Sequence, residues 1–496
     1  MPPAVASAPW TIPGPRPRPV VGRTSQVVRY IRDPIGCTSR LFTQYGPIVS
    51  LVAGGGTNLF SPYGTPGTIF VYGPALMRQV RTPHERWNLA PLTGTLYPVG
   101  DVSPRTQALT HFMTRPWGLD GAAHHAQRKV VLPAFHHHHL AAYRDAMIAI
   151  THAVLARWRI GAPIDVATHM RYLTGQIATQ TLFGTDHAAH SQAAGQTLQA
   201  AIAAFSSPLT TLLPYDLPRL PYHRFLDLTT RFGAQMRALI GQKRATGADD
   251  GDVLSLLLHA RDEERDAALD DDEVIAWVGA LFAAGHETSS LALTWTLLLL
   301  AQHPAIAADL LDELTGTLGG DAPTVEQLRP ERGHLPLLDA VIKESMRVIP
   351  PAPFTWRYAA HPTELDGYHV PQGTEVYGSI YHTHHMPDVY AAPEQFNPRR
   401  WETITPNAWE YLPFSAGPRR CIGAEFATME MKIILALLLQ HYRLECLPSV
   451  PIDRAGIVTI APKHGLRMRV HRQDRRFTQG VGGVHGTVRE MVALPT

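Results

Sequence analysis

A cysteine in a short, glycine-flanked loop is the residue of this chain best suited to bind a metal. Cys421 follows two arginines, lies between Gly417 and Gly423, and precedes a long apolar run typical of a helix. A thiol binds a metal strongly as the thiolate, which nearby cations and the N-terminal end of a helix favour. The glycines let backbone N–H groups approach the sulfur. Cys421 is therefore a candidate metal ligand, although an unpaired cysteine alone is more often a small core residue.

A carboxylate beside a hydroxyl interrupts the longest apolar run. Residues 274–301 are almost wholly apolar, acidic residues at 271–273 favour a helix start, and Glu287 with Thr288 lies in the middle. Because an ionised carboxylate is costly in lipid, a helix buried in a large domain explains the run better than a membrane span. An acid next to a hydroxyl can relay protons through water. A helix kinked at a satisfied Ser/Thr patch is the structural alternative.

Two further pairs of polar residues share a helix face. A helix that opens near Leu119 with Asp120 as its N-cap places His124 and Arg128 four residues apart, and Glu344 precedes Arg347 by three. Taken alone, an exposed Glu–Arg pair contributes about a few tenths of a kcal/mol, and the alternative for His124 and Arg128 is a solvated basic helix face. Residues 136–139 are four histidines that point in different directions around a helix, so we expect a surface loop there rather than a metal site.

In combination, these segments resemble the motifs of the cytochrome P450 family. Residues 414–423 match FxxGxRxCxG at all five specified positions, and residues 284–288 match AGx(E/D)T. Residues 120–128 match DGxxHxxxR, Glu344 and Arg347 form an ExxR pair, and residues 396–401 match FxPxRW. The motifs follow the family order, and the resemblance covers about residues 31–472. It implies a mainly α fold with a minor β-sheet region, and haem buried between the distal oxygen-binding helix and the proximal cysteine loop and helix.

The resemblance implies a haem b cofactor whose iron is ligated by Cys421. The cofactor-binding residues implied are His124, Arg128, Ala284, Gly285, Arg357, His384, Phe414, Arg419, Cys421 and Gly423. Four of them, His124, Arg128, Arg357 and Arg419, would hold the two haem propionates, for which the guanidinium fork is well suited. His385 stands where the family carries an arginine after His384, which leaves the contact there open.

The resemblance also implies roles in catalysis and in packing. Thr288 would hold water at the oxygen-binding site, and Glu287 would resupply protons. Glu344, Arg347 and Arg400 would form a buried charge network that locks the core behind the cysteine loop, a structural role. The candidate residues for the substrate pocket are Ala283, Ala352, Pro353 and Phe354.

The function implied is that of a haem-thiolate monooxygenase, which inserts one oxygen atom of O2 into an apolar organic substrate by hydroxylation or epoxidation. Electrons would come from a separate ferredoxin or flavodoxin and an NAD(P)H-dependent reductase, docked on a basic proximal patch of Lys129, Arg399, Arg420 and Lys432. A peroxygenase, or a peroxide isomerase or dehydratase on the same fold, is one alternative. A haem-binding sensor without catalysis is another, and the substrate stays open.

Composition excludes several other classes of protein. The 496 residues carry a net charge of +2 and are 17% charged, so no basic field indicates nucleic acid. Cys37, Cys421 and Cys446 lie far apart without CxxC spacing, which argues against a disulfide framework or a zinc site and fits a reducing cytoplasm. The N-terminus lacks an apolar segment for a signal peptide or anchor. We expect a soluble, cytoplasmic monomer without a membrane anchor.

The elements that must position these residues fall into three parts. Residues 1–30 form a proline-rich, extended lead-in, residues 31–472 a single haem domain, and residues 473–496 a loosely held C-terminal extension. We expect strands at 45–51 and 68–72, a loop at 91–110, and helices from 140 to 246. Prolines break these helices at 208–218, a segment that roofs the substrate channel in the resembling family. A hairpin with its turn at Gly373 is expected over 365–374, and a strand over 379–385.

Overall fold

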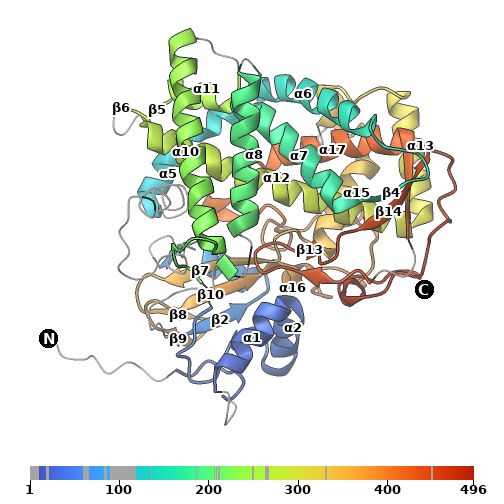
Figure 1. The fold of residues 1–496 in the computed structure, drawn as a ribbon. Coiled ribbons are helices and arrows are strands. Elements are labelled where there is room, and N and C mark those ends of the chain that lie inside the picture. Colours follow the sequence, from blue (N-terminus) through green and yellow to red (C-terminus); the bar gives the residue numbers. More distant parts are fainter. Residues whose placement is uncertain are drawn as a thin grey trace.

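The computed structural model describes residues 10–17, 22–59, 66–82, 86–89, 105, 119–135, 137–185, 187–205, 207, 209–210, 213–247, 251–262, 267–329, 332–447 and 451–496. Within them the chain is mainly α-helical with several small sheets, as predicted. Helices fill the upper part of the view in Figure 1, and the largest sheet lies below them with α1 and α2. The predicted loop at 91–110 lies outside the described residues, apart from Arg105.

The largest sheet joins strands that are far apart in the sequence. Its order is β1-β2-β10-β7-β3, with β2 and β10 parallel and the other neighbours antiparallel. Its strands and the helices around them are α1 (Thr24–Arg32), α2 (Pro34–Tyr45), β1 (Ile48–Ser50), β2 (Thr68–Val71), α3 (Pro74–Arg81), β3 (Trp87–Asn88), β7 (Phe354–Ala359) and β10 (Glu375–Ser379). The two strands predicted near the N-terminus are confirmed. The extended lead-in packs here, because the Pro13 carbonyl accepts the Ser50 N–H at 2.7 Å.

The helical part contains the predicted long apolar helix at its centre. The other helices and small strands are α5 (Gly121–Val131), α6 (His137–Leu155), β4 (Pro163–Asp165), α7 (Val166–Phe183), α8 (Ala188–Phe205), α10 (Pro221–Thr246), α11 (Val253–His259), β5 (Arg261–Asp262), β6 (Ala267–Ala268), α13 (Pro304–Leu318), α14 (Val325–Leu328), α15 (Pro336–Val348), β8 (Thr363–Leu365), β9 (Tyr368–Val370), α16 (Ile380–His384), α17 (Ala424–His441), β11 (Tyr442–Cys446), β12 (Arg454–Ala455), β13 (Ala461–Pro462) and β14 (Arg467–Arg472). Short 3-10 helices include η4 (Pro398–Glu402) and η5 (Gly417–Arg419).

The central helix α12 (Asp271–Gln302) begins at a capping box. Asp270 accepts the N–H of Glu273, and the Glu273 carboxylate accepts the N–H of Asp270 in return, which satisfies two N–H groups at the helix start. The helix is apolar on nearly all sides because α7, α15 and α17 pack around it. No single helix in the described ranges meets the length and composition required to cross a membrane, whereas the bent pair α12 and α13 meets it jointly, with a 111° bend.

Several elements differ from the sequence predictions. Residues 380–384 form the short helix α16 instead of a strand, because the Ser379 side chain caps its start by accepting the His382 N–H. The turn of the β8–β9 hairpin lies at Asp366 and Gly367, which both have positive φ, and not at Gly373. The histidines from His137 onward begin α6 and do not form a loop.

The predicted domain boundaries also need correction. Helix α1 crosses the boundary placed after residue 30. In the proline-rich break, residues 213–217 are not helical, but Leu209 and Thr210 are. Residues 473–496 are not loosely held, because their apolar side chains lie in the main core.

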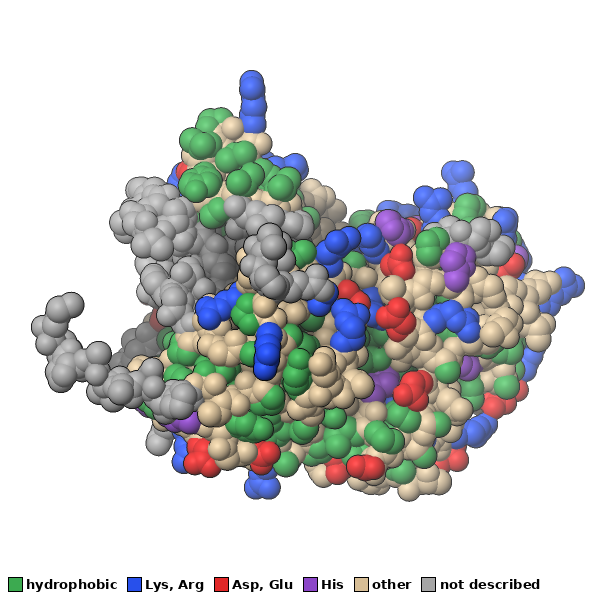
Figure 2. Space-filling model, turned by 90° about the horizontal axis from the view of Figure 1, so that it is seen from below, with side chains coloured by type: hydrophobic (Ala, Val, Ile, Leu, Met, Phe, Trp, Pro, Cys, Tyr) green, Lys and Arg blue, Asp and Glu red, His purple; other side chains and the backbone are tan. Residues whose placement is uncertain are grey.

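Charge is mixed over the face shown in Figure 2. Lys and Arg side chains alternate with Asp and Glu side chains there, with hydrophobic side chains between them. This distribution agrees with the small net charge of +2. No extended field of one sign covers the part of this face that the structure describes.

Candidate functional site

The cysteine loop bends sharply before it reaches Cys421. Ser415 and Gly417 have φ values of 63° and 73°, in the left-handed region that favours glycine. The Cys421 N–H then donates to the Phe414 carbonyl at 2.9 Å, which closes the loop directly before α17. The loop therefore presents the cysteine at the start of a long buried helix, as the sequence predicted.

The Cys421 thiol lies inside the protein and is nevertheless accessible. Cys421 has solvent-exposed surface in the structure. The protein that surrounds the sulfur still desolvates it, and this desolvation raises the pKa of the thiol. The Gly423 N–H and the guanidinium groups of Arg128 and Arg420 act in the opposite direction and favour the thiolate. A metal ion bound to the sulfur would replace the thiol proton and so stabilise the thiolate.

A buried cluster of guanidinium groups lies near the thiol. Burial, followed by repulsion from Arg81 and Arg419, holds the pKa of Arg357 well below its usual range. Arg357 and Arg81 are 5% and 6% exposed. Asp120, 2.5 Å from Arg419, is the one carboxylate that forms an ion pair with this cluster among the described residues. Buried cations in such excess require anionic partners, so the cluster fits a ligand with carboxylate groups, such as the two propionates of haem.

Arg81 is a member of this cluster that the sequence analysis missed. It lies at the end of α3, and its guanidinium donates to the Ser415 hydroxyl, to the Thr355 hydroxyl, and to the Ala416 carbonyl at 3.3 Å. Burial, and then the charge of Arg419, lowers its pKa to about 10. Arg81 thus joins the cysteine loop to β7. No spacing in the sequence marks it, because its partners come from residues more than 270 positions away.

The other predicted cofactor residues are divided between two places. His124 and Arg128 lie on α5, both half-buried, and the Arg128 charge acts on Cys421. Asp120 occupies the N-cap position of α5 as predicted, but its carboxylate accepts the Leu89 N–H and the Arg419 guanidinium and does not cap the helix. His384 lies elsewhere, in the charge network described below.

One side of α12 is accessible at the predicted oxygen segment. Leu281, Ala284, Gly285 and Thr288 have accessible surface and are spaced as one helical face, although α12 is otherwise mostly buried. The Thr288 hydroxyl donates to the Ala284 carbonyl at 2.6 Å. Glu287 precedes Thr288 and is half-buried. The predicted acid and hydroxyl are therefore both partly accessible to solvent.

His286, between the predicted residues, has a structural environment. It is 3% exposed, its Nδ1 lies 3.2 Å from the Phe282 carbonyl, and its own carbonyl accepts the Thr174 hydroxyl of α7 at 2.8 Å. Burial lowers the pKa of its imidazole to about 4. A neutral, enclosed ring cannot resupply protons at physiological pH, so Glu287 remains the candidate acid.

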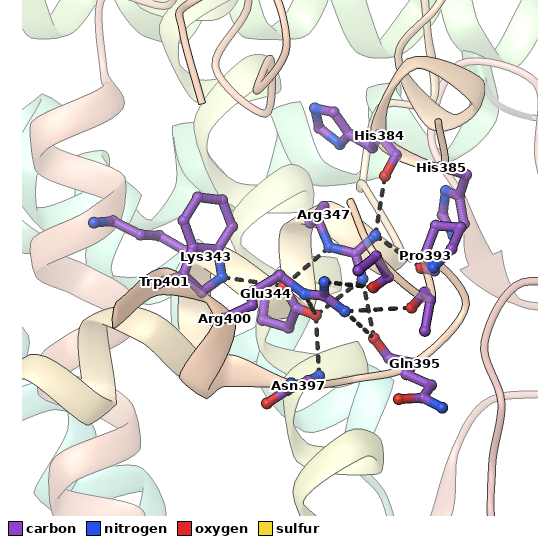
Figure 3. Close-up of polar contacts among 12 residues, drawn as sticks. Lys343, Glu344, Arg347, His384, His385, Pro393, Gln395, Asn397, Arg400 and Trp401 are labelled. Carbon is purple, nitrogen blue, oxygen red and sulfur yellow. Dashed lines mark hydrogen bonds and ion pairs between the residues drawn. The ribbon is translucent and has the colours of Figure 1, made fainter. Parts of the chain in front are cut away.

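The predicted charge network is assembled around Glu344 (Figure 3). Its carboxylate accepts both Arg347 Nε and Nη2 at 2.9 Å, Arg400 Nε at 2.8 Å, and Trp401 Nε1 at 3.0 Å. Glu344 and Arg347 are fully buried. With the Asn397 N–H, which donates at 3.0 Å, five charge-assisted bonds satisfy this buried carboxylate, which is the condition under which a buried ion pair is tolerated.

His384 belongs to the surroundings of this network. Its carbonyl accepts Arg347 Nη1 at 2.9 Å, its Nε2 accepts the Leu412 N–H at 2.7 Å, and its ring stacks on Tyr411 with the centroids 5.4 Å apart. It is completely buried. The structure thus places His384 between Arg347 and the chain that leads to the cysteine loop.

The predicted substrate-pocket residues differ in their exposure. Ala283 and Ala352 are half-buried, whereas Phe354 is 3% exposed and packs in the core with its ring centroid 6.1 Å from that of Tyr30. The Pro353 carbonyl accepts two N–H groups from the start of α16. Ala283 and Ala352 therefore keep accessible surface, whereas Phe354 is enclosed in the core.

The expected basic patch is smaller than predicted. Lys129 and Arg420 are exposed, and exposed Arg399 pairs with Asp309 at 2.6 Å. The prediction that Lys432 is exposed was wrong. Lys432 is completely buried, where it pairs with Asp339 at 2.5 Å and donates to a carbonyl of α14.

Comparison with known proteins gives a consistent family. The family model of cytochrome P450 matches residues 105–467. The chain is 33% identical to the cyclooctat-9-en-7-ol 5-monooxygenase of Streptomyces melanosporofaciens over 338 residues, which are 67% of this chain and 73% of that protein. It is 31% identical to the cytokinin hydroxylase of Arabidopsis thaliana over 362 residues, 70% of each chain.

Solved structures agree with this match. The retinoic acid-bound cyanobacterial CYP120A1 has a TM-score of 0.77 and 26% identity, and the alignment covers 94% of this chain and 100% of that chain. The haem domain of cytochrome P450DA, with a TM-score of 0.76 and 23% identity, shares the fold. The mainly α fold predicted from the motifs is therefore confirmed.

Proposed function

The chain belongs to the cytochrome P450 family and is a monooxygenase, and we propose that it oxidises an apolar small molecule at a haem ligated by Cys421. The observation that carries the proposal is the accessible Cys421 thiol beside a buried guanidinium cluster, which forms an ion pair with a single carboxylate within the described part of the chain. The inserted oxygen atom comes from O2 and enters a C–H bond or a double bond. Haem b is the form proposed, with Cys421 as the protein ligand to its iron.

Each group of residues has a part in holding the cofactor. Cys421 binds the iron as thiolate, and Arg357, Arg419, Arg128 and Arg81 bind the propionates. A bound haem supplies the iron at which O2 is activated, and a thiolate ligand favours cleavage of the O–O bond. His124 on α5 lies one turn from Arg128 and serves the same edge. Phe414 and Gly423 shape the loop around the sulfur.

The accessible face of α12 handles water and protons. Gly285 and Ala284 have small side chains and leave room for O2. The Thr288 hydroxyl, held by the Ala284 carbonyl, turns its lone pairs outward and accepts a hydrogen bond from water. Glu287, which is half-buried and directly precedes Thr288 in the chain, resupplies protons from solvent. Glu344, Arg347 and Arg400 act structurally and fix the core behind the loop.

The substrate and the electron donor are assigned by class. Retinoic acid, which the cyanobacterial structure binds, has a mostly hydrocarbon skeleton, and the candidate pocket residues Ala283 and Ala352 are apolar. Lys129 and Arg420, exposed on the side of the cysteine loop, suit an acidic ferredoxin or flavodoxin that receives electrons from an NAD(P)H-dependent reductase. We propose a monomer that works in the cytoplasm.

One optical experiment tests the ligand, and one turnover experiment tests the reaction. Haem-loaded protein, reduced under carbon monoxide, should show the far-red-shifted absorption of thiolate coordination, and Cys421→Ser should lose it. Retention of that absorption in Cys421→Ser contradicts the assignment. Turnover of an apolar substrate, selected by its low-to-high-spin shift, should require NAD(P)H, O2 and the redox proteins. Turnover with a peroxide alone would favour a peroxygenase.

A further inference from the structure

The C-terminal segment packs into the protein although it lies beyond the residues that match the family. We call residues 474–496 the C-terminal strap; the family model ends at residue 467. Val488, Met491 and Val492 of the strap are 0–1% exposed and belong to the main core. In Figure 1 this red part of the chain runs along one side of the molecule to the C label. Such burial requires a structural or functional reason, because a tail without one stays loose.

The strap begins at the C-terminal end of the central helix. Gln302 of α12 is fully buried, donates to the Gly480 carbonyl at 2.9 Å, and accepts the Gly482 N–H at 2.9 Å. The NH2 group and the carbonyl oxygen of the Gln302 side chain therefore both bond to the strap. The C-terminal end of α12, the helix that contains Thr288, is therefore fixed to the strap.

The strap ends on the segment that holds the charge network. Ala493 forms a parallel bridge with Gln395, and its N–H donates to the Glu394 carbonyl at 2.8 Å. The Met491 carbonyl lies 3.2 Å from His385 Nε2, while His385 Nδ1 lies 2.8 Å from the Tyr381 carbonyl. A neutral imidazole carries one N–H, so His385 donates to one of these two carbonyl groups at a time.

The contacts of the strap and those of the network share residues. Gln395 pairs with the strap, and its carbonyl accepts Arg347 at 3.0 Å and Arg400 at 3.4 Å. His385 contacts the strap, and the adjacent His384 accepts the Leu412 N–H at 2.7 Å. Leu412 stands two residues before Phe414, the residue whose carbonyl accepts the Cys421 N–H. A continuous chain of contacts, exposed or half-buried at the strap and fully buried at His384, thus leads from the strap to the cysteine loop.

Arginines fix the path of the strap. Arg489 donates to three carbonyl groups within the strap, those of Val484, Leu494 and Pro495, at 2.8–3.0 Å. Arg454 donates to the Thr487 carbonyl at 2.7 Å and pairs with Glu490 at 2.6 Å. Since Arg454 also pairs with Asp33 at 3.1 Å, the strap is tied to the N-terminal helices as well.

We propose that the C-terminal strap is a positioning element of the thiolate site. It fixes residues 393–395 and α16, and through them the Glu344 network and Leu412 hold the cysteine loop. His385, which stands where the family has an arginine, supplies one of its docking contacts. The proposal rests on the proposed ligation of haem iron by Cys421.

The backbone of Ala493 allows a matched test, because its side chain is exposed. Ala493→Pro removes the N–H that bonds to Glu394 and blocks the bridge, whereas Ala493→Ser keeps both. Haem-loaded Ala493→Pro should lose haem to an excess of apomyoglobin about fivefold to tenfold faster than wild type, the effect of losing one or two hydrogen bonds. Part of its reduced carbon monoxide complex should lack the thiolate absorption, and Ala493→Ser should match wild type in both.

A second variant and a second measurement keep the outcomes distinct. A chain that ends after Glu490 lacks both docking contacts, and hydrogen exchange of residues 412–421 should accelerate in it and in Ala493→Pro. Fast exchange of the remaining strap with unchanged haem retention in either variant overturns the proposal. Unchanged strap exchange in both variants overturns it too, since the docking contacts would then not hold the strap. Absence of thiolate absorption in the wild type overturns the proposed function and this proposal together.

Discussion

Thr288 holds its own helix as well as facing water. Its hydroxyl proton is directed at the Ala284 carbonyl at 2.6 Å, which leaves the oxygen lone pairs free to accept a hydrogen bond from a water molecule. Residue identity at 288 therefore matters for the fate of protons more than for the stability of the helix.

We expect Thr288→Ala to uncouple NAD(P)H consumption from product formation. Without the hydroxyl, water on the accessible face of α12 loses its acceptor, so product per NAD(P)H should fall by roughly tenfold or more, and peroxide should appear instead. Thr288→Ser keeps the hydroxyl and should retain most of the coupling. Product, NAD(P)H and peroxide are measured in the same reactions. Equal coupling in the alanine and serine variants would contradict the role assigned to Thr288.

Only some members of the guanidinium cluster can be predicted from the sequence. Arg357 and Arg419 were predicted from motifs in which they occupy fixed positions beside a recognised element. Arg81 was not, because its role arises only when α3, β7 and the cysteine loop meet. The prediction that Lys432 lies on the basic proximal surface is wrong because a lysine, seldom buried, is paired here with Asp339 of another helix.

At the scale of elements, α12 is held by its neighbour α7 at the oxygen segment. Thr174 of α7 is fully buried, and its hydroxyl lies 2.8 Å from the His286 carbonyl and 3.0 Å from the Met170 carbonyl of its own helix. One hydroxyl proton serves one of these acceptors at a time. The contact to His286 fixes the backbone two residues before Thr288.

We expect Thr174→Val to disturb catalysis as well as stability. The change removes the buried hydrogen bond that the hydroxyl donates, at a cost of about 0.5–1.5 kcal/mol, and removes a restraint on the oxygen segment. Urea unfolding should report the loss of stability, and product per NAD(P)H should fall in the folded enzyme. Thr174→Ser restores the donor and should restore the coupling. A stability loss with coupling equal to wild type would limit Thr174 to a packing role.

Elements with strong local signals were predicted well, and those defined by distant contacts were not. The acidic start and apolar length of α12 are local, and so is the bend of the cysteine loop, which requires glycine at 417. The resemblance to the family predicts a strand over residues 379–385, but residues 380–384 do not form one. They form α16 because the Ser379 side chain caps a helix there and His385 docks on the strap, 106 residues away.

At the scale of the whole molecule, buried histidines set the response to acid. Burial lowers the pKa of His382 to about 3, those of His385 and His286 to about 4, and that of His384 well below its usual range. Three of these rings lie on or beside α16, next to the charge of Arg347 and to the strap. Burial acts in the opposite sense on Glu430 of α17, whose pKa is raised to about 8.

The sign of the pH dependence follows from these shifts. An unfolded histidine has a pKa of about 6.5, so between pH 6.5 and 4 the unfolded state binds more protons at these four residues, and stability is lost as pH falls. Glu430 opposes this, because its folded pKa is higher than its unfolded one. For these five groups the net uptake of up to three protons predicts a loss of at most about 4 kcal/mol per pH unit, or about 10 kcal/mol between pH 6.5 and 4, which is comparable to a typical folding stability of about 5–15 kcal/mol.

We therefore expect the haem-loaded protein to unfold cooperatively between roughly pH 6 and 4, the range between the unfolded and folded pKa values of these histidines. The thiolate absorption should be lost in the same transition. Urea unfolding at stepped pH values gives the slope directly. His382→Gln, which keeps a polar side chain beside Ser39 and Ser379, should lower the slope by about 1.4 kcal/mol per pH unit, the contribution of one proton. His361→Gln, at an exposed position, should leave it unchanged. If His382→Gln keeps the wild-type slope, carboxylates rather than buried histidines set the acid limit, because the proton counted here would then not be taken up by that ring.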